Sequence, residues 1–298
     1  MDYEFLLQDR IQKIQQVIGE YGIDNFSISY SGGKDSNVLS VLIDLALPGN
    51  RIPRVYADTG IELNAVRDFV RAKCEEDDRF VIVKPKVPIK QMLERVGYPF
   101  KSKRHSNYLE LFQRYGCDID NPNITSVKNY AGKGKPWTRR NLCPKILQYQ
   151  FTPEFKLKIS DLCCDELKKK PLSTWNAENN KPYSIIGLMA EEGGRRSGAK
   201  CLVFNRRRTK LEAFQPLASM TKDWEDWFIA KYDIKLPILY YPPYNFERTG
   251  CKGCPFCIEL QYELDILEKY FPAERKQCEI IWKPVYDEYR RLGYRLKR

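Results

Sequence analysis

The hydrophobic pattern of the chain alternates between a strand period and a helix period. Short apolar runs typical of buried strands lie at residues 26–30, 54–57, 79–84 and 183–188. Apolar side chains recur at helical spacing at residues 1–20, 38–46, 62–73 and 89–96. This alternation predicts an α/β fold: a parallel, twisted, Rossmann-like sheet with helices on both faces and right-handed crossovers.

The pattern loosens between residues 97 and 155, where a helix at residues 105–115 precedes a polar, basic segment interleaved with aromatic residues. Such an insertion suits a nucleic-acid or substrate lid, and a solvated insertion is the alternative. Order returns with a helix at residues 161–169, which we expect Pro171 to end. Two helices, at residues 259–271 and 274–291, close the chain. We expect a nucleotide-binding domain at residues 1–220 and a helical, cysteine-bearing portion at residues 221–298.

A compact polar motif follows the first strand. Ser31-Gly32-Gly33-Lys34-Asp35-Ser36 lies between that strand and an apolar helix. A strand that turns through glycines into a helix directs free backbone N–H groups and the positive end of the helix dipole at one point, which favours a phosphate. The motif is not a P-loop, because Ile28 occupies the first glycine position and Asp35 follows the lysine. An ordinary Gly-Gly turn is the alternative interpretation.

Two later strand ends carry further candidates. Asp58-Thr59-Gly60 follows the second strand and would lie beside the first motif, where an acidic or backbone group can hold an adenine or ribose. The segment from Gly187 ends in Arg195-Arg196, and paired arginines can clamp a phosphate or sulfate through two hydrogen bonds each. A common turn and an exposed charge run are the respective alternatives.

Composition narrows the class of protein. At 298 residues, 43% hydrophobic and 30% charged, the chain is typical of a globular protein with a full core. No apolar run approaches a membrane span, and the first residues are acidic and amphipathic, unlike a signal peptide. We therefore expect a cytoplasmic protein without a membrane partner. A net charge of +11 indicates a polyanionic partner such as nucleic acid or a nucleotide, unless most of it is solvated surface.

The cysteines form a candidate metal site. Ten cysteines in a chain without a secretion signal do not indicate a disulfide framework. The single histidine, His105, makes a mixed His/Cys metal site unfavourable. Cys163-Cys164 and Cys251-x-x-Cys254 supply four thiolates, with Cys257 as a spare. Four thiolates suit zinc or an iron–sulfur cluster, and adjacent cysteines are accommodated more easily by a four-iron cluster. Redox-active or unliganded thiols are the remaining alternative.

Five segments occur in a telling order: SGGKDS, ADTG, CCDELKKKP, GLMAEEGGRR and TGCKGCPF. Together they resemble the phosphoadenosine-phosphosulfate (PAPS) reductase family of the adenine-nucleotide alpha-hydrolase-like (PP-loop ATP pyrophosphatase) superfamily. The resemblance implies that residues 31–36 hold phosphates, that Asp58-Thr59-Gly60 and Gly187 complete the nucleotide site, and that Arg195 and Arg196 meet the distal phosphate or sulfate. It also implies a [4Fe-4S] cluster on Cys163, Cys164, Cys251 and Cys254.

One departure from that family changes the expected chemistry. Its assimilatory reductases carry a nucleophilic cysteine in a Glu-Cys-Gly tail, whereas the last cysteine here is Cys278, inside an expected helix. We therefore favour ATP pyrophosphatase chemistry that activates an acceptor for sulfur transfer, as in DndC-type and SspD-type phosphorothioation proteins and cluster-bearing tRNA thiolases. The catalytic residues would be Lys34, Asp35, Arg195 and Arg196.

Three partners accompany this expectation: Mg²⁺ with the nucleotide, a sulfur or electron donor protein, and DNA or tRNA on the basic insertion. The first alternative is a reductase that releases sulfite from adenylylsulfate or its 3′-phosphorylated form, with Cys257 as the replacement nucleophile. The second is a nucleotide-binding module with a structural cluster and no turnover.

Overall fold

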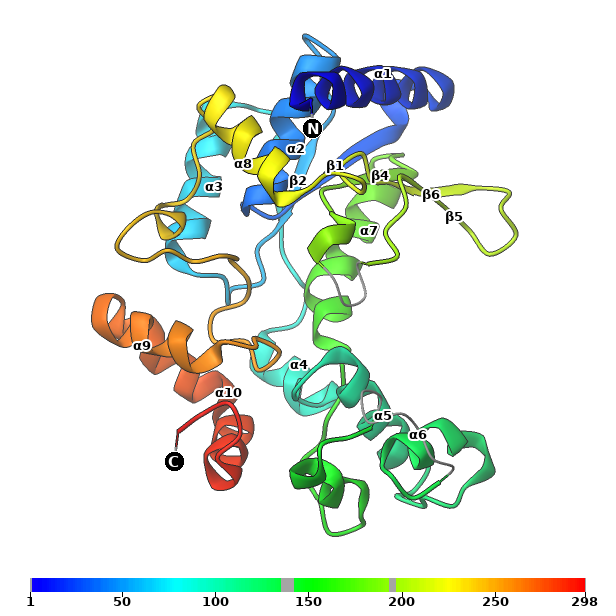
Figure 1. Ribbon diagram of the computed structural model, residues 1–298, viewed down its shortest axis with the longest axis vertical. Coiled ribbons are helices and arrows are strands. Elements are labelled where there is room, and N and C mark those ends of the chain that lie inside the picture. Colours follow the sequence, from blue (N-terminus) through cyan, green and yellow to red (C-terminus); the bar gives the residue numbers. More distant parts are fainter. Residues whose placement is uncertain (1, 135–141, 193–196, 298) are drawn as a thin grey trace. The chain divides into compact units, whose positions relative to one another are not determined.

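A computed structural model describes residues 2–134, 142–192 and 197–297 of the chain (Figure 1). The chain divides into two compact units, and each is built from two separate stretches. Unit 1 comprises residues 1–85 and 168–250, and unit 2 comprises residues 86–167 and 251–298. This division does not coincide with the expected boundary at residue 220, because each unit draws on both halves of the sequence.

Unit 1 contains a single six-stranded sheet in the order β3-β2-β1-β4-β6-β5. Its strands are β1 (Phe26–Tyr30), β2 (Arg54–Ala57), β3 (Phe80–Val83), β4 (Tyr183–Ile186), β5 (Leu202–Phe204) and β6 (Leu211–Phe214). All neighbouring strands are parallel except β5, which pairs antiparallel with β6 at one edge. The expected α/β fold is confirmed. The carboxyl ends of β1, β2 and β4 therefore lie along one edge of the sheet, so the loops that follow these strands are neighbours.

The helices of unit 1 cover both faces of this sheet. They are α1 (Tyr3–Tyr21), α2 (Lys34–Ala46), α3 (Asn64–Glu76), α7 (Lys170–Glu178) and α8 (Lys222–Lys231), with short 3₁₀ turns η1 (Ile23–Asn25), η6 (Ala190–Glu192) and η8 (Ile238–Tyr240). Phe26 and Ile28 of β1 join one apolar core with α1, α2 and α8. Ser27 points to the opposite face, where its hydroxyl donates to Asn176 of α7 at 2.8 Å. The alternation of β1 therefore selects which helix lies on which face.

The expected helix at residues 161–169 is present, but Pro171 does not end it. Residues 163–164 are α-helical, residues 165–169 form the π-helical turn η5 (Asp165–Lys169), and α7 continues directly from it. Pro171 lies in the first turn of α7, where its missing N–H costs no hydrogen bond. The pattern also missed β6, whose sequence, LEAF, has no β-branched residue and contains Glu and Ala, which are depleted in strands.

Unit 2 is mainly helical. Its helices are α4 (Ile89–Val96), α5 (Lys103–Arg114), α6 (Thr125–Tyr130), α9 (Leu260–Tyr270) and α10 (Pro272–Leu292), with 3₁₀ turns η2 (Pro122–Ile124) and η4 (Lys145–Phe151). The described part of the basic insertion thus contains α5, α6, η2 and η4, more regular structure than its polarity indicated. His105 is fully buried there between Tyr130 and Gln150, and burial lowers its pKa to about 3, so it is a neutral core residue. None of the described helices has the length and apolar character that crossing a membrane requires.

Candidate functional site

The Ser31–Ser36 motif is a tight turn braced by its own side chains. Gly32 has φ +73°, and a Cβ there would lie 2.8 Å from the side chain of Val70 on α3, so only glycine fits. The Ser36 hydroxyl donates to the Gly33 carbonyl at 2.9 Å. The Asn37 amide donates to the carbonyls of Gly32 and Gly33 at 3.1 and 2.9 Å. These bonds turn the carbonyls inward, and Gly33, as N-cap of α2, receives no side-chain cap.

Tyr240 lies directly at the start of α2. Its hydroxyl accepts from the backbone N–H of Lys34 at 3.1 Å and is 2.9 Å from the Thr249 hydroxyl. A Cβ on Gly33 would come within 3.2 Å of the Tyr240 hydroxyl oxygen. An oxygen therefore already sits where the helix N-terminus would hold a phosphate oxygen. Sequence analysis missed Tyr240, because only scattered prolines marked that connection, and it included Thr249 only as the first residue of TGCKGCPF, without a role of its own.

Acidic residues of α8 surround the lysine and aspartate of the motif. The Lys34 ammonium forms an ion pair with Asp226 at 3.1 Å. Glu225 is 2% exposed, and burial, followed by the negative charge of Asp35, raises the pKa of Glu225 to about 8. Within the described chain its Oε1 atom has no hydrogen-bond partner. At neutral pH Glu225 is therefore mainly protonated.

Asp58-Thr59-Gly60 follows β2, as expected, but its side chains serve the local turn. The Asp58 carboxylate accepts from the Gly60 N–H at 3.1 Å and pairs with Arg67 at 3.1 Å. The Thr59 hydroxyl donates to buried Glu62 at 2.7 Å. Gly60 has φ +81°, and a Cβ there would meet nothing within 4 Å. The turn therefore presents backbone to open space. Arg67 and Glu62, which the sequence analysis missed, hold it in place.

Gly187 brings the end of β4 against the motif. A Cβ at this position would lie 2.8 Å from the backbone oxygen of Asp35, closer than real side chains approach. Only glycine allows this contact, which places the end of β4 beside the motif; the role of Gly187 in nucleotide binding stays a prediction. Arg195 and Arg196, expected to bind the distal phosphate or sulfate, lie outside the described residues.

The four candidate metal ligands all belong to unit 2. A hydrogen bond to Cys164, burial and the nearby thiols of Cys254 and Cys251 raise the pKa of Cys163. Burial and then Cys251 raise the pKa of Cys254, with a further contribution from Cys164. The four thiols thus lie near enough to act on one another. Across residues 2–134, 142–192 and 197–297, however, no three Cys, His, Asp or Glu side chains converge closely enough to hold a metal ion.

The Cys251–Cys257 segment, which we call the cysteine knuckle, consists of two consecutive turns. The N–H of Cys254 bonds to the Cys251 carbonyl at 3.2 Å, and the N–H of Cys257 to the Cys254 carbonyl at 2.8 Å. Gly253 between them has φ +58°, and a Cβ there would lie 2.8 Å from the Cys278 sulfur. The backbone of the knuckle is therefore shaped by glycine and pressed against α10.

Side chains of α9, α10 and the chain end fix the knuckle from outside. Trp282 donates to the Lys252 carbonyl at 2.9 Å, Tyr289 to the Pro255 carbonyl at 2.8 Å, and the Gly253 N–H donates to Glu263 at 2.9 Å. Lys252 forms a buried ion pair with Glu274 at 2.9 Å. Such external support preorganises thiol donors. The four cysteines fit a thiolate-bound metal group, because thiolates are suitable ligands and the four thiols lie near one another. Their side chains would still have to converge on that group.

Comparisons with known proteins give one relative and several solved structures that align with the chain. No model of a protein family matches the chain. The chain is 30% identical over 299 residues to an uncharacterized protein of Methanocaldococcus jannaschii, a match that covers 96% of this chain and 57% of that protein. The chain thus spans little more than half the length of this relative.

Three solved structures align at low identity. The phosphoadenylyl-sulfate reductase of Candida auris, in its phosphate complex, is 12% identical with a TM-score of 0.42, over 80% of this chain and 88% of that one. The NH3-dependent NAD synthetase of Campylobacter jejuni is 13% identical with a TM-score of 0.41, over 98% and 96%. The U34-tRNA thiolase NcsA of Methanococcus maripaludis, with its [4Fe-4S] cluster, is 15% identical with a TM-score of 0.40, over 97% and 80%.

Proposed function

We propose that this chain is an adenine-nucleotide-binding enzyme of the PP-loop ATP pyrophosphatase type, which activates an acceptor for sulfur transfer. The observation that carries the proposal is the start of α2. Two glycines, an N-cap without a side-chain partner and Lys34 meet at the carboxyl edge of the sheet, next to the open turn at Gly60. In this proposal the phosphates replace the Tyr240 hydroxyl at the Lys34 N–H, and the Gly60 turn faces the adenosine.

The proposed reaction has two balanced steps. An oxygen of the acceptor attacks the α-phosphorus of ATP, the bond to the β-phosphate breaks, and pyrophosphate leaves with the electron pair. Sulfide then attacks the acceptor atom that carries the adenylate, and AMP leaves with the acceptor's former oxygen. Lys34 and the backbone N–H groups stabilise negative charge on the departing pyrophosphate, and Mg²⁺ shares the triphosphate charge. Asp35 would assist at the same turn of α2, and Arg195 and Arg196 would bind the distal phosphate.

Unit 2 would supply the sulfur side of the reaction. Cys163, Cys164, Cys251 and Cys254 would hold a [4Fe-4S] cluster, which when bound offers a site for sulfide or for electrons. Cys257 is less suited to act as a free nucleophile, because burial, and next the charge of Glu263, raise its pKa to about 12. This observation favours sulfur transfer over the reductase alternative, in which Cys257 would attack the sulfur.

The test compares two substrates in parallel. Anaerobically purified protein, assayed for iron, is incubated with Mg-ATP, and separately with adenylylsulfate and reduced thioredoxin. We expect pyrophosphate and AMP from ATP, and no sulfite above background from adenylylsulfate. Sulfite without pyrophosphate would replace the proposal by the reductase. If neither product forms, the chain would be a nucleotide-binding module without turnover. That result would equally refute the proposal.

A further inference from the structure

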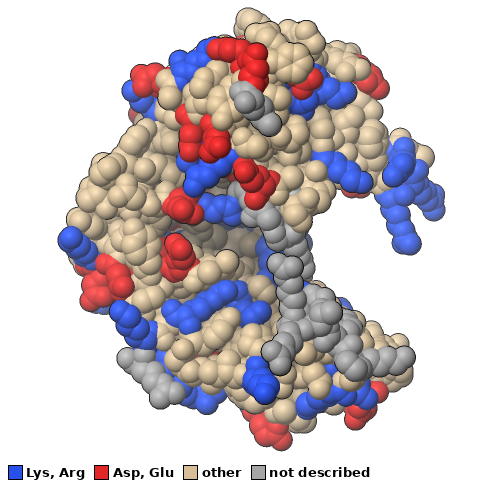
Figure 2. Space-filling model, in the orientation of Figure 1, with Lys and Arg blue, Asp and Glu red and all other residues tan. Residues whose placement is uncertain are grey.

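A cluster of positive charge lies on the β5–β6 hairpin of unit 1, far in sequence from the basic insertion. Its members are Lys200, Arg206, Arg207, Arg208 and Lys210. The stretch from residue 198 to 210 contains no acidic residue, and residues 206–210 are all exposed. Figure 2 shows Lys and Arg side chains gathered on the projection that the hairpin forms in the same view of Figure 1.

These cations are available for a partner. None of them forms an ion pair with a carboxylate among the described residues. The insertion differs, because Lys128 pairs with Asp120 at 2.8 Å and Lys133 donates to the Phe151 carbonyl at 3.3 Å. Arg104 stacks there over the rings of Tyr108 and Tyr130. Three cations of the insertion are thus engaged within unit 2, whereas the hairpin keeps its positive charge unneutralised.

The hairpin turn is a defined structure. The Asn205 side chain accepts from the N–H of Thr209 at 2.8 Å and donates to the Thr209 hydroxyl at 3.0 Å. The N–H of Asn205 closes the turn on the Lys210 carbonyl at 2.9 Å. Arg208 has φ +56°, a left-handed conformation that costs most non-glycine residues roughly 1 kcal/mol. The N–H of Arg208 donates to the Asn205 carbonyl at 2.8 Å, which holds the arginine within the turn.

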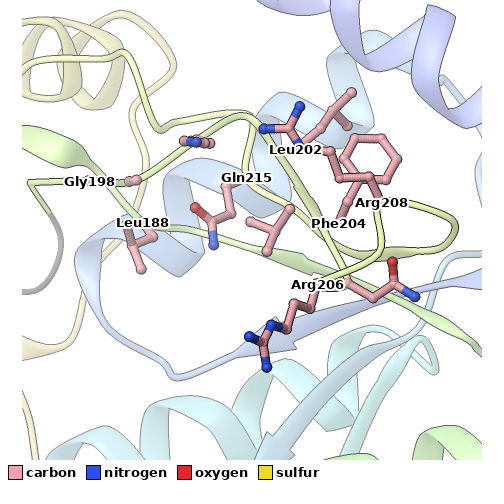
Figure 3. Close-up of a pocket in the computed structure, with 11 residues that line it drawn as sticks. Leu188, Gly198, Leu202, Phe204, Arg206, Arg208 and Gln215 are labelled. Atoms are coloured by element: carbon pink, nitrogen blue, oxygen red, sulfur yellow. The ribbon is translucent and has the colours of Figure 1, made fainter.

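A groove runs from this turn along the edge strand β5. Its cavity measures about 790 Å³, within the range of small-molecule sites. Leu188 and Gly198 line one side, Phe204, Arg206 and Arg208 the other, and Gln215 lies between them (Figure 3). Phe204 is 37% exposed. The groove thus offers an aromatic face and apolar walls beside guanidinium groups, a combination that accommodates a stacked base together with its phosphates.

The groove begins next to the proposed nucleotide site. Leu188 lines it, and the preceding residue, Gly187, is the one that lies against the Asp35 backbone oxygen. A molecule held along β5 would therefore extend toward the first turn of α2 from the hairpin side. In the proposed function this is the direction from which an acceptor would reach an activated nucleotide.

From these observations we propose that the β5–β6 hairpin and its groove bind the phosphodiester backbone of a single-stranded nucleic acid, with a base stacked on Phe204. Arginine forks match phosphate oxygens, and consecutive arginines on a fixed turn suit a repeating anion better than an isolated one. Only the biological role of this binding rests on the proposed function, in which the bound nucleic acid would be the sulfur acceptor. Binding itself requires no nucleotide turnover.

Fluorescence anisotropy with labelled single-stranded RNA, single-stranded DNA, duplex DNA and polyglutamate tests the proposal. We compare the full-length protein with the triple variant Arg206→Ala, Arg207→Ala, Arg208→Ala and with the matched insertion variant Lys128→Ala, Lys133→Ala. The triple variant should bind single strands at least tenfold more weakly, and its log–log salt slope should fall by about 2. The insertion variant should bind as the wild type does. Phe204→Ala should weaken single-strand binding more than duplex binding, since stacking needs unpaired bases.

The outcomes separate this proposal from the proposed function. Unchanged affinity and salt slope in the triple variant, equal loss in the insertion variant, or equal binding of polyglutamate would each overturn it. Pyrophosphate release from Mg-ATP without nucleic acid should be unaltered in the triple variant. Hairpin-dependent binding without pyrophosphate release would refute the proposed function and leave this inference standing; the reverse result would refute this inference alone.

Discussion

Replacing Glu225 by glutamine should abolish a specific dependence of stability on pH. Glu225 is 2% exposed, and the groups that act on it are Asp35, Lys34 and Asp226. Burial and Asp35 raise its folded-state pKa to about 8 from an ordinary value of 4.5. The folded protein therefore keeps a proton that the unfolded chain releases above pH 4.5. Its stabilising contribution is fully present below pH 4.5 and is lost as the pH rises toward 8.

The size of the effect follows from the pKa values. One pKa unit corresponds to about 1.4 kcal/mol, so between pH 6 and pH 9 the wild type should lose roughly 3 kcal/mol of unfolding free energy through this group. Glutamine remains neutral, so Glu225→Gln should lack this loss. Urea unfolding followed by tryptophan fluorescence at pH 6, 7, 8 and 9 measures it. Other groups titrate in both proteins, so the difference between the two profiles isolates Glu225.

A matched control is available on the same helix. Asp223 is an exposed carboxylate in the first turn of α8, and Asp223→Asn should follow the wild-type profile. The stability advantage of Glu225→Gln over the wild type should grow by roughly 3 kcal/mol from pH 6 to pH 9. Parallel profiles for the wild type and Glu225→Gln would refute the conclusion that buried Glu225 keeps its proton beside the motif at neutral pH.

Three further substitutions test other parts of the structure. Tyr240→Phe removes the hydroxyl that occupies the Lys34 N–H, so a phosphate would no longer compete with that hydroxyl. ATP affinity, measured by calorimetry, should rise about fivefold. Weaker ATP binding would instead indicate that the Tyr240 hydroxyl is a nucleotide ligand. Lys252→Met leaves Glu274 buried without its cation and should lower unfolding free energy by about 3–5 kcal/mol in urea, a loss that adding Glu274→Gln should partly reverse. Failure of the second change to recover any stability would contradict this explanation. Cys164→Ser should lower iron content after anaerobic reconstitution, while Cys201→Ser in unit 1 should not, and equal iron in both variants would show the ligand set to be wrong.

Local sequence was sufficient for β1, β2 and the turn that follows β1. Residues 26–30 and 54–57 were predicted as strands with the bounds that the structure gives them, because each is a short buried run next to polar turn residues. Gly32 was predicted in a turn between strand and helix and Gly187 at a strand end, and the contacts of a Cβ at either position show why each is glycine. These features depend on residues adjacent in the chain or on strand order.

Residues that contact the motif from distant parts of the sequence could not be predicted from local patterns. Tyr240, Glu225 and Asp226 reach the Ser31–Ser36 motif from segments about 200 residues away, and nothing in their own spacing marks them. The expected boundary at residue 220 does not match the two units for a similar reason. Each unit is built from two stretches that are remote in sequence, and local patterns do not show which stretches pack together. The charged hairpin was missed because β6, with the sequence LEAF, lacks the β-branched residues that mark a strand.

Direct titration of ATP measures the central claim, that residues 31–36 hold nucleotide phosphates. Isothermal titration calorimetry with a non-hydrolysable ATP analogue and Mg²⁺ compares the wild type, Lys34→Ala, and Lys222→Ala as an exposed-lysine control on α8. Circular dichroism verifies the fold of each protein. We expect the wild type and Lys222→Ala to bind alike, and Lys34→Ala to bind at least tenfold more weakly, because a charged hydrogen bond contributes about 1.5–3 kcal/mol. Equal affinity of Lys34→Ala and the wild type, or no binding by the wild type, would contradict the account.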